Sequence, residues 1–159
     1  MEEKIKELSI YRFDKANKSL LVAEKLFAEG EYGYSQNRAY YALFDAIRSI
    51  TALDGFDSSK HSGIIAHFNQ CYVKTSIFSP NTSSIIRLAS MLREKSDYED
   101  FYEPDKEDTK EIIDSVRTFL AKLVIISNNK EFYSLIELTP LKTNEGLLLY
   151  IMCDTIRIT

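Results

Sequence analysis

The chain has 159 residues, 45% of them hydrophobic, which is enough for one domain with its own core. Its formal net charge of −4 excludes a basic field over the whole surface, so any contact with phosphate has to be local. It shows no signal peptide or membrane-spanning run, and Cys71 and Cys153 have neither metal nor disulfide spacing. We therefore expect a cytoplasmic protein with no membrane contact and no cofactor.

Helices dominate the predicted secondary structure. The chain has only 5 Gly and 3 Pro, and its apolar residues recur at steps of three and four. Gly30 follows the first helical pattern, as is typical of a helix C-terminus, and Pro104 suits the first turn of the last helix. The predicted helices cover about residues 4–29, 34–53, 62–73, 82–96 and 104–126.

The C-terminal part differs in composition. Residues 127–159 are rich in β-branched and aromatic side chains, and their pattern fits helix and strand equally. This part is too short for a separate domain. We therefore predict an all-α protein, in which residues 1–126 form an antiparallel bundle of about five helices. Residues 127–159 form an extension that packs on the bundle or on a second copy.

The second predicted helix carries a line of polar residues, Tyr34, Arg38, Tyr41, Asp45 and Arg48, beside its apolar stripe. Seven residues return to nearly the same direction on a helix, so Arg38 and Asp45 share a face. This face is one candidate for a binding site. The structural alternative is an ordinary ion pair between Asp45 and Arg48, with Arg38 stacked on Tyr41.

A second candidate lies before the third predicted helix, where Lys60 and His61 stand near backbone amides that can bind an anion. The structural alternative is that Ser58 or Ser59 caps the helix and His61 lies half-exposed beside it. His67 falls on a different face from His61, so the two lack the four-residue spacing at which a helix presents a zinc pair. We therefore expect no metal site.

Three segments match the pattern of one family in the same order along the chain. The matching residues are Arg38, Ala39, Tyr40, Tyr41, Ala42 and Phe44, then Lys60, His61, Ser62 and Gly63, then Arg93, Asp97 and Tyr98. On these residues the chain resembles the HEPN domain family, in particular its small stand-alone members, over about residues 8–125.

The resemblance implies a helical bundle that often forms a homodimer through the face that carries Arg38. Many HEPN proteins are metal-independent ribonucleases, in which an arginine stabilises the phosphorane charge and a histidine assists proton transfer at the ribose 2′-hydroxyl. Here Asp45 occupies the position of that histidine. A carboxylate is a poor proton donor at neutral pH and repels phosphate.

Three functional interpretations remain open. The first is a dimeric component of a toxin–antitoxin-like system that works beside a minimal nucleotidyltransferase and binds RNA or a nucleotide. Its binding residues would be Arg38, Tyr41, Arg48, Lys60 and His61. The second is a ribonuclease in which Arg38 and Asp45 are catalytic, or in which His61 serves as the base. The third is a scaffold in which Arg38, Tyr41 and Asp45 only stabilise a homodimer.

Overall fold

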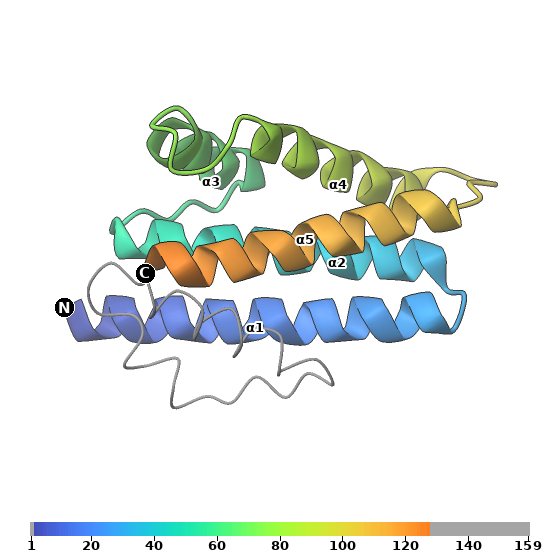
Figure 1. The fold of residues 1–159 in the computed structure, drawn as a ribbon, viewed down its shortest axis with the longest axis horizontal. Coiled ribbons are helices and arrows are strands. Elements are labelled where there is room, and N and C mark those ends of the chain that lie inside the picture. Colours follow the sequence, from blue (N-terminus) through green and yellow to red (C-terminus); the bar gives the residue numbers. More distant parts are fainter. Residues whose placement is uncertain (1, 128–159) are drawn as a thin grey trace, which may run out of the picture.

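The computed structural model describes residues 2–127, and every regular element in this part of the chain is helical (Figure 1). The predicted all-α bundle is therefore confirmed. The predicted extension lies outside the described residues, apart from Ser127 at the end of the last helix. The elements are α1 (Glu2–Ala28), α2 (Tyr32–Leu53), α3 (His61–Phe68), the π-helix η1 (Asn69–Val73), α4 (Asn81–Tyr98) and α5 (Lys106–Ser127).

The turn between α1 and α2 is built on Gly30, as predicted. Gly30 has a φ of 81°, a left-handed conformation that glycine adopts without steric cost. The amide of Glu31 donates to the carbonyl oxygen of Leu26 at 2.9 Å, which closes the end of α1. The chain reverses here, so α2 runs back antiparallel to α1 (Figure 1).

Two predicted helices, the third and the last, differ in detail from the structure. Pro104 does not lie in the first turn of α5, because Asp105 caps this helix by accepting the amide of Asp108 at 2.9 Å. The helix α4 begins after Pro80 without a side-chain cap. The predicted third helix covers both α3 and η1, since the helical hydrogen bonding widens to a π-helix after Phe68.

The helix α2 lies at the centre of the bundle, in contact with α1, α3, α4 and α5 (Figure 1). It is consequently buried on most of its circumference, including Leu43 at 1% exposure and Phe44 at 5%. A predicted polar position on this helix, Asp45, is only 2% exposed. The core also includes Phe68, Phe78, Ile112, Val116, Phe119 and Leu123.

A buried amide joins α2 to the other side of the bundle. Gln36 is 1% exposed and donates to the hydroxyl of Thr109 at 2.9 Å. Its side-chain oxygen accepts the hydroxyl of Ser96 at 2.8 Å and that of Tyr102 at 3.3 Å. Because a buried amide needs such partners, these bonds fix the start of α2 against α4 and α5.

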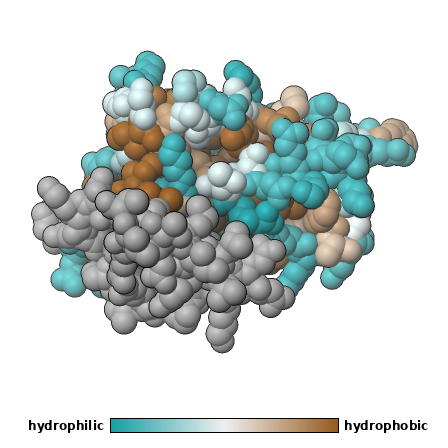
Figure 2. Space-filling model, in the orientation of Figure 1, coloured by the Kyte–Doolittle hydropathy of each residue, from teal (hydrophilic) through white to brown (hydrophobic). Residues whose placement is uncertain are grey.

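Polar residues cover much of the right-hand part of the face in Figure 2, towards the connector between α4 and α5, and apolar residues gather at the left near α3. Within the described residues, no helix combines the length and apolar character that crossing a membrane requires.

Candidate functional site

Side chains from α2, α3 and α4 gather around the ring of Tyr41. The guanidinium carbon of Arg38 lies 5.2 Å from the ring centroid, and that of Arg93 lies 5.6 Å from it. Arg93 also donates a hydrogen bond of 3.1 Å to the hydroxyl of Tyr41. One partly buried ring therefore contacts two cations from different helices.

A short polar chain connects the two arginines. Arg38 donates to Oδ1 of Asn37 from Nε at 3.1 Å and from Nη2 at 2.8 Å. The amide group of Asn37 donates to both oxygens of Asp97, at 2.9 and 3.1 Å. Nε of Arg93 lies 2.8 Å from Oδ2 of Asp97. Arg93 thus pairs directly with Asp97, while Arg38 is linked to the same carboxylate only through Asn37.

His61 lies at the edge of this arrangement, as the first residue of α3. Its ring stacks on Phe44 with centroids 3.8 Å apart and meets the Tyr41 ring edge-on at 6.3 Å. Its Nδ1 shares a hydrogen bond of 2.9 Å with the hydroxyl of Tyr40, and Nε2 has no hydrogen-bond partner among the described residues. We name Asn37, Arg38, Tyr41, His61, Arg93 and Asp97 the Tyr41 cluster.

The surroundings keep His61 neutral at pH 7. Desolvation of the ring lowers its pKa below the ordinary value of 6.5, and the positive charges of Arg93 and Arg48 lower it further. The negative charge of Asp45 acts in the opposite direction but is the smallest of these effects. Burial also raises the pKa of Tyr40, so its hydroxyl stays protonated beside the imidazole.

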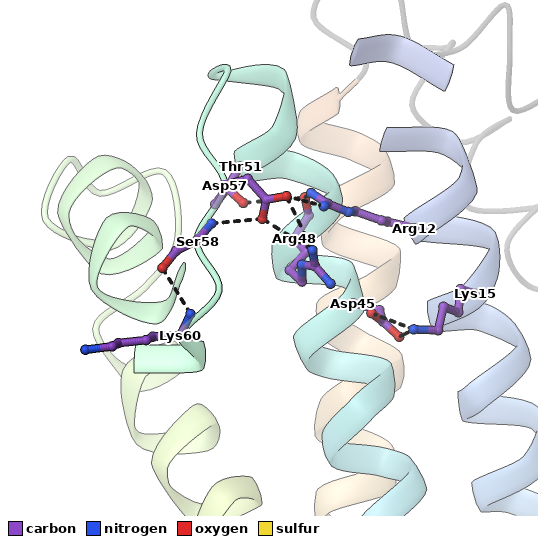
Figure 3. Close-up of polar contacts among 8 residues, drawn as sticks. All are labelled: Arg12, Lys15, Asp45, Arg48, Thr51, Asp57, Ser58 and Lys60. Carbon is purple, nitrogen blue, oxygen red and sulfur yellow. Dashed lines mark hydrogen bonds and ion pairs between the residues drawn. The ribbon is translucent and has the colours of Figure 1, made fainter. Parts of the chain in front are cut away.

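Arg48 belongs to a different arrangement (Figure 3). Its Nη2 lies 3.3 Å from Oδ1 of Asp57, while Nη2 of Arg12 lies 2.6 Å from Oδ2 of the same carboxylate. These contacts fasten the loop after α2 to α1 and hold the pKa of Asp57 below its ordinary value, against the opposing effect of desolvation. Arg48 therefore has a structural partner, although it is close enough to influence His61.

Lys60 is exposed, and Figure 3 shows its side chain pointing away from Asp57 and Arg48. Its amide donates to the hydroxyl of Ser58 at 3.2 Å. Ser58 thus contacts the turn before α3, and no side chain caps the first turn of this helix. The expected serine cap is wrong in this respect.

Asp45 points towards α1 (Figure 3). Nζ of Lys15 lies 3.2 Å from Oδ2 of Asp45, and it donates to Oδ1 at 3.3 Å. Among the described residues Asp45 forms no ion pair with Arg38 or Arg48, so the expected pair with Arg48 is wrong. The reason is that α1 packs against this part of α2 and supplies a closer cation.

The family profile described as HEPN domain matches residues 11–128. The chain belongs to the HEPN domain family. It is 29% identical over 136 residues to "Putative toxin MJ0142" of Methanocaldococcus jannaschii. This alignment covers 81% of this chain and 92% of that relative. It is 31% identical over 120 residues to a UPF0332 protein of Thermotoga maritima, and this alignment covers 76% of this chain and 90% of that relative.

A further relative from Methanocaldococcus jannaschii, "Putative toxin MJ0605", is 28% identical over 108 residues, or 68% of this chain and 80% of that relative. The HEPN chain thus has relatives whose names point to toxins, and its fold is a helical bundle.

In this HEPN chain, the sequence-predicted residues Arg38, Tyr41 and His61 come together, while Arg48 and Lys60 lie beside other partners. The sequence interpretation did not place Asn37 or Arg93 in the site. Arg93 was visible only as a match to the third family segment, and its contact with Tyr41 spans 52 positions of the chain.

Proposed function

We propose that this HEPN protein binds a phosphate-bearing ligand, RNA or a nucleotide, at the Tyr41 cluster, as one component of a toxin–antitoxin-like system. The names of its relatives support the toxin-like part of this proposal. The family resemblance adds a homodimer and a minimal nucleotidyltransferase as partners. All of these partners are part of the proposal.

The observation that carries the proposal is the pair of guanidinium groups on one partly buried tyrosine ring. Guanidinium groups match the geometry of phosphate oxygens, and aromatic rings stack on the bases of single strands. Tyr98 adds a second ring, 74% exposed, with the guanidinium carbon of Arg93 5.5 Å from its centroid. Aromatic and cationic groups therefore alternate over a small surface, as single-stranded RNA recognition requires.

The proposal predicts that Arg38→Ala weakens RNA binding about tenfold, since one charge-assisted contact to phosphate is removed. The measurement is fluorescence anisotropy of a labelled single-stranded oligoribonucleotide at low salt, with EDTA present. Arg87→Ala is the matched control, because Arg87 is exposed on α4 and contacts only Ser84 among the described residues.

Competition with ATP in the same assay separates the two ligands, because a nucleotide site would release the oligonucleotide at low ATP concentration. Equal affinities for the Arg38→Ala and Arg87→Ala variants would refute binding at the Tyr41 cluster.

A second candidate function is metal-independent RNA cleavage with His61 as the base, and the geometry of His61 favours it over Asp45. When Nδ1 carries the ring proton and donates to Tyr40, Nε2 is a free acceptor. It can take the proton of a ribose 2′-hydroxyl while the 2′-oxygen attacks phosphorus. The bond from phosphorus to the 5′-oxygen then breaks, and the leaving oxygen takes a proton from solvent. A positive charge near His61, from Arg93, would stabilise the phosphorane.

The cleavage hypothesis predicts that His61→Gln lowers the rate of RNA cleavage at least about 100-fold while RNA binding remains. The rate should rise with pH through a pKa below 6.5 and then level off, because the base acts unprotonated and its pKa is lowered. The cleavage rate is measured by incubating single-stranded RNA with the wild type or with His61→Gln, in EDTA, across a pH series. Cleavage that persists in His61→Gln, or its absence in the wild type, would exclude His61 as a base.

A further inference from the structure

Three potential metal ligands meet at the end of α2, away from the contacts of the Tyr41 cluster. Asp54 follows the last residue of α2, His67 lies in the last turn of α3, and Cys71 lies in η1. One carboxylate oxygen, one ring nitrogen and the sulfur lie within 4.8 Å of one another. No role in the proposed function involves these three side chains.

We propose that Asp54, His67 and Cys71 bind a divalent transition metal of the zinc class. Thiolate and imidazole are donors that favour zinc over magnesium or calcium, and a carboxylate completes a three-ligand set with one open position. His67 and Cys71 are four residues apart in sequence, a spacing that places both side chains on the same side of one helix.

His67 lies between the other two side chains, with one ring nitrogen towards each. Nε2 of His67 lies 2.8 Å from Oδ2 of Asp54, and Nδ1 lies 4.0 Å from Sγ of Cys71. Bonds of about 2.0–2.3 Å in a tetrahedral site place neighbouring ligand atoms about 3.3–3.8 Å apart. An imidazole binds one ion through one nitrogen, and with one nitrogen counted the three ligand atoms lie within 4.8 Å of one another. Relative shifts of up to about 1.5 Å would bring them to tetrahedral spacing. The cysteine proton passes to solvent when the thiolate binds.

Surrounding groups hold the ligands in place. The hydroxyl of Tyr72 donates to Oδ1 of Asp54 at 2.7 Å and orients the carboxylate. The ring of Phe56 stacks on His67 with centroids 4.0 Å apart and an interplanar angle of 3°. The side chains of His67 and Asp54 are 21% and 32% exposed, so an ion can enter from solvent. The π-helical turn that carries Cys71 is a feature often found at functional sites.

The test is a titration of the reduced full-length protein with Co²⁺, which gives a thiolate-to-cobalt charge-transfer absorption when sulfur binds the ion. We expect this absorption at one equivalent, its loss on adding Zn²⁺, and no displacement by Mg²⁺. Cys71→Ser should abolish it, whereas Cys153→Ser, the matched control, should retain it. His67→Gln should weaken zinc affinity at least about tenfold in calorimetry.

Circular dichroism of each variant confirms that the helices persist, and His67→Gln keeps the test decisive if Cys71→Ser unfolds. The proposal is overturned if the wild type gives no charge-transfer absorption, if Cys71→Ser retains it, or if His67→Gln binds zinc like the wild type.

Discussion

Replacing Asp45 with lysine is expected to unfold the protein or to bring it close to unfolding. Asp45 is 2% exposed and faces the ammonium group of Lys15 at 3.2 Å. Asp45→Lys would bury a second cation beside the ammonium group of Lys15, whose own side chain is 53% exposed. Placing an unpaired charge at this buried position costs about 3–5 kcal/mol. Domains of this size have a free energy of unfolding of only about 5–15 kcal/mol.

Urea unfolding followed by circular dichroism measures this loss of stability. Asp14→Lys is the matched control, because Asp14 also pairs with a lysine of α1, Lys18, but its side chain is 41% exposed and that of Lys18 is 73% exposed. It should change stability by less than about 1 kcal/mol. The scaffold interpretation predicts a different result for Asp45→Lys, a stable monomer. An unfolding midpoint equal to that of Asp14→Lys would contradict the structural role of Asp45.

The second large effect is expected at the centre of the candidate site. Tyr41→Ala removes the ring against which both Arg38 and Arg93 pack, together with the hydroxyl that accepts a hydrogen bond from Arg93. Both guanidinium groups gain rotational freedom, and a stacking surface is lost. Base stacking on one aromatic ring contributes about 1–3 kcal/mol, so RNA affinity should fall about 5- to 150-fold.

The conservative variant Tyr41→Phe separates stacking from hydrogen bonding. It keeps the ring and loses only the acceptor for Arg93, so its RNA affinity should fall less than about threefold. Anisotropy titrations at one salt concentration compare the two variants. If Tyr41→Phe and Tyr41→Ala bind equally well, the ring does not organise the site.

The helices could be predicted from the sequence because their signals are local. Apolar periodicity and Gly30 located α1, and scarcity of Gly and Pro left room for long helices. The predicted start of α5 is too early in the chain, because Pro104 and Asp105 are both typical of a helix start and stand side by side. Asp105 accepts the amide of Asp108, while Pro104 lies outside the helix.

The site was harder to predict, because helical periodicity gives the direction of a side chain but not its neighbour. Arg38 and Asp45 do lie along one line of α2, yet α1 supplies Lys15 to Asp45. Asn37 supports Arg38 and reaches Asp97, 60 positions away, a contact that no local pattern encodes.

The proposed metal ligands show the same limit. The four-residue spacing of His67 and Cys71 is present in the sequence. We compared His67 only with His61, so this pair of ligands was not predicted. Asp54 joins them only because α3 folds back on the end of α2.

The central claim is that the two arginines of the Tyr41 cluster bind RNA together. The most direct measurement is the affinity of the Arg38→Ala/Arg93→Ala double variant for single-stranded RNA, beside Arg87→Ala at the same salt concentration. Two lost phosphate contacts should weaken binding about 100-fold, and the salt dependence should become shallower. A folded double variant that binds RNA as tightly as Arg87→Ala would contradict the account.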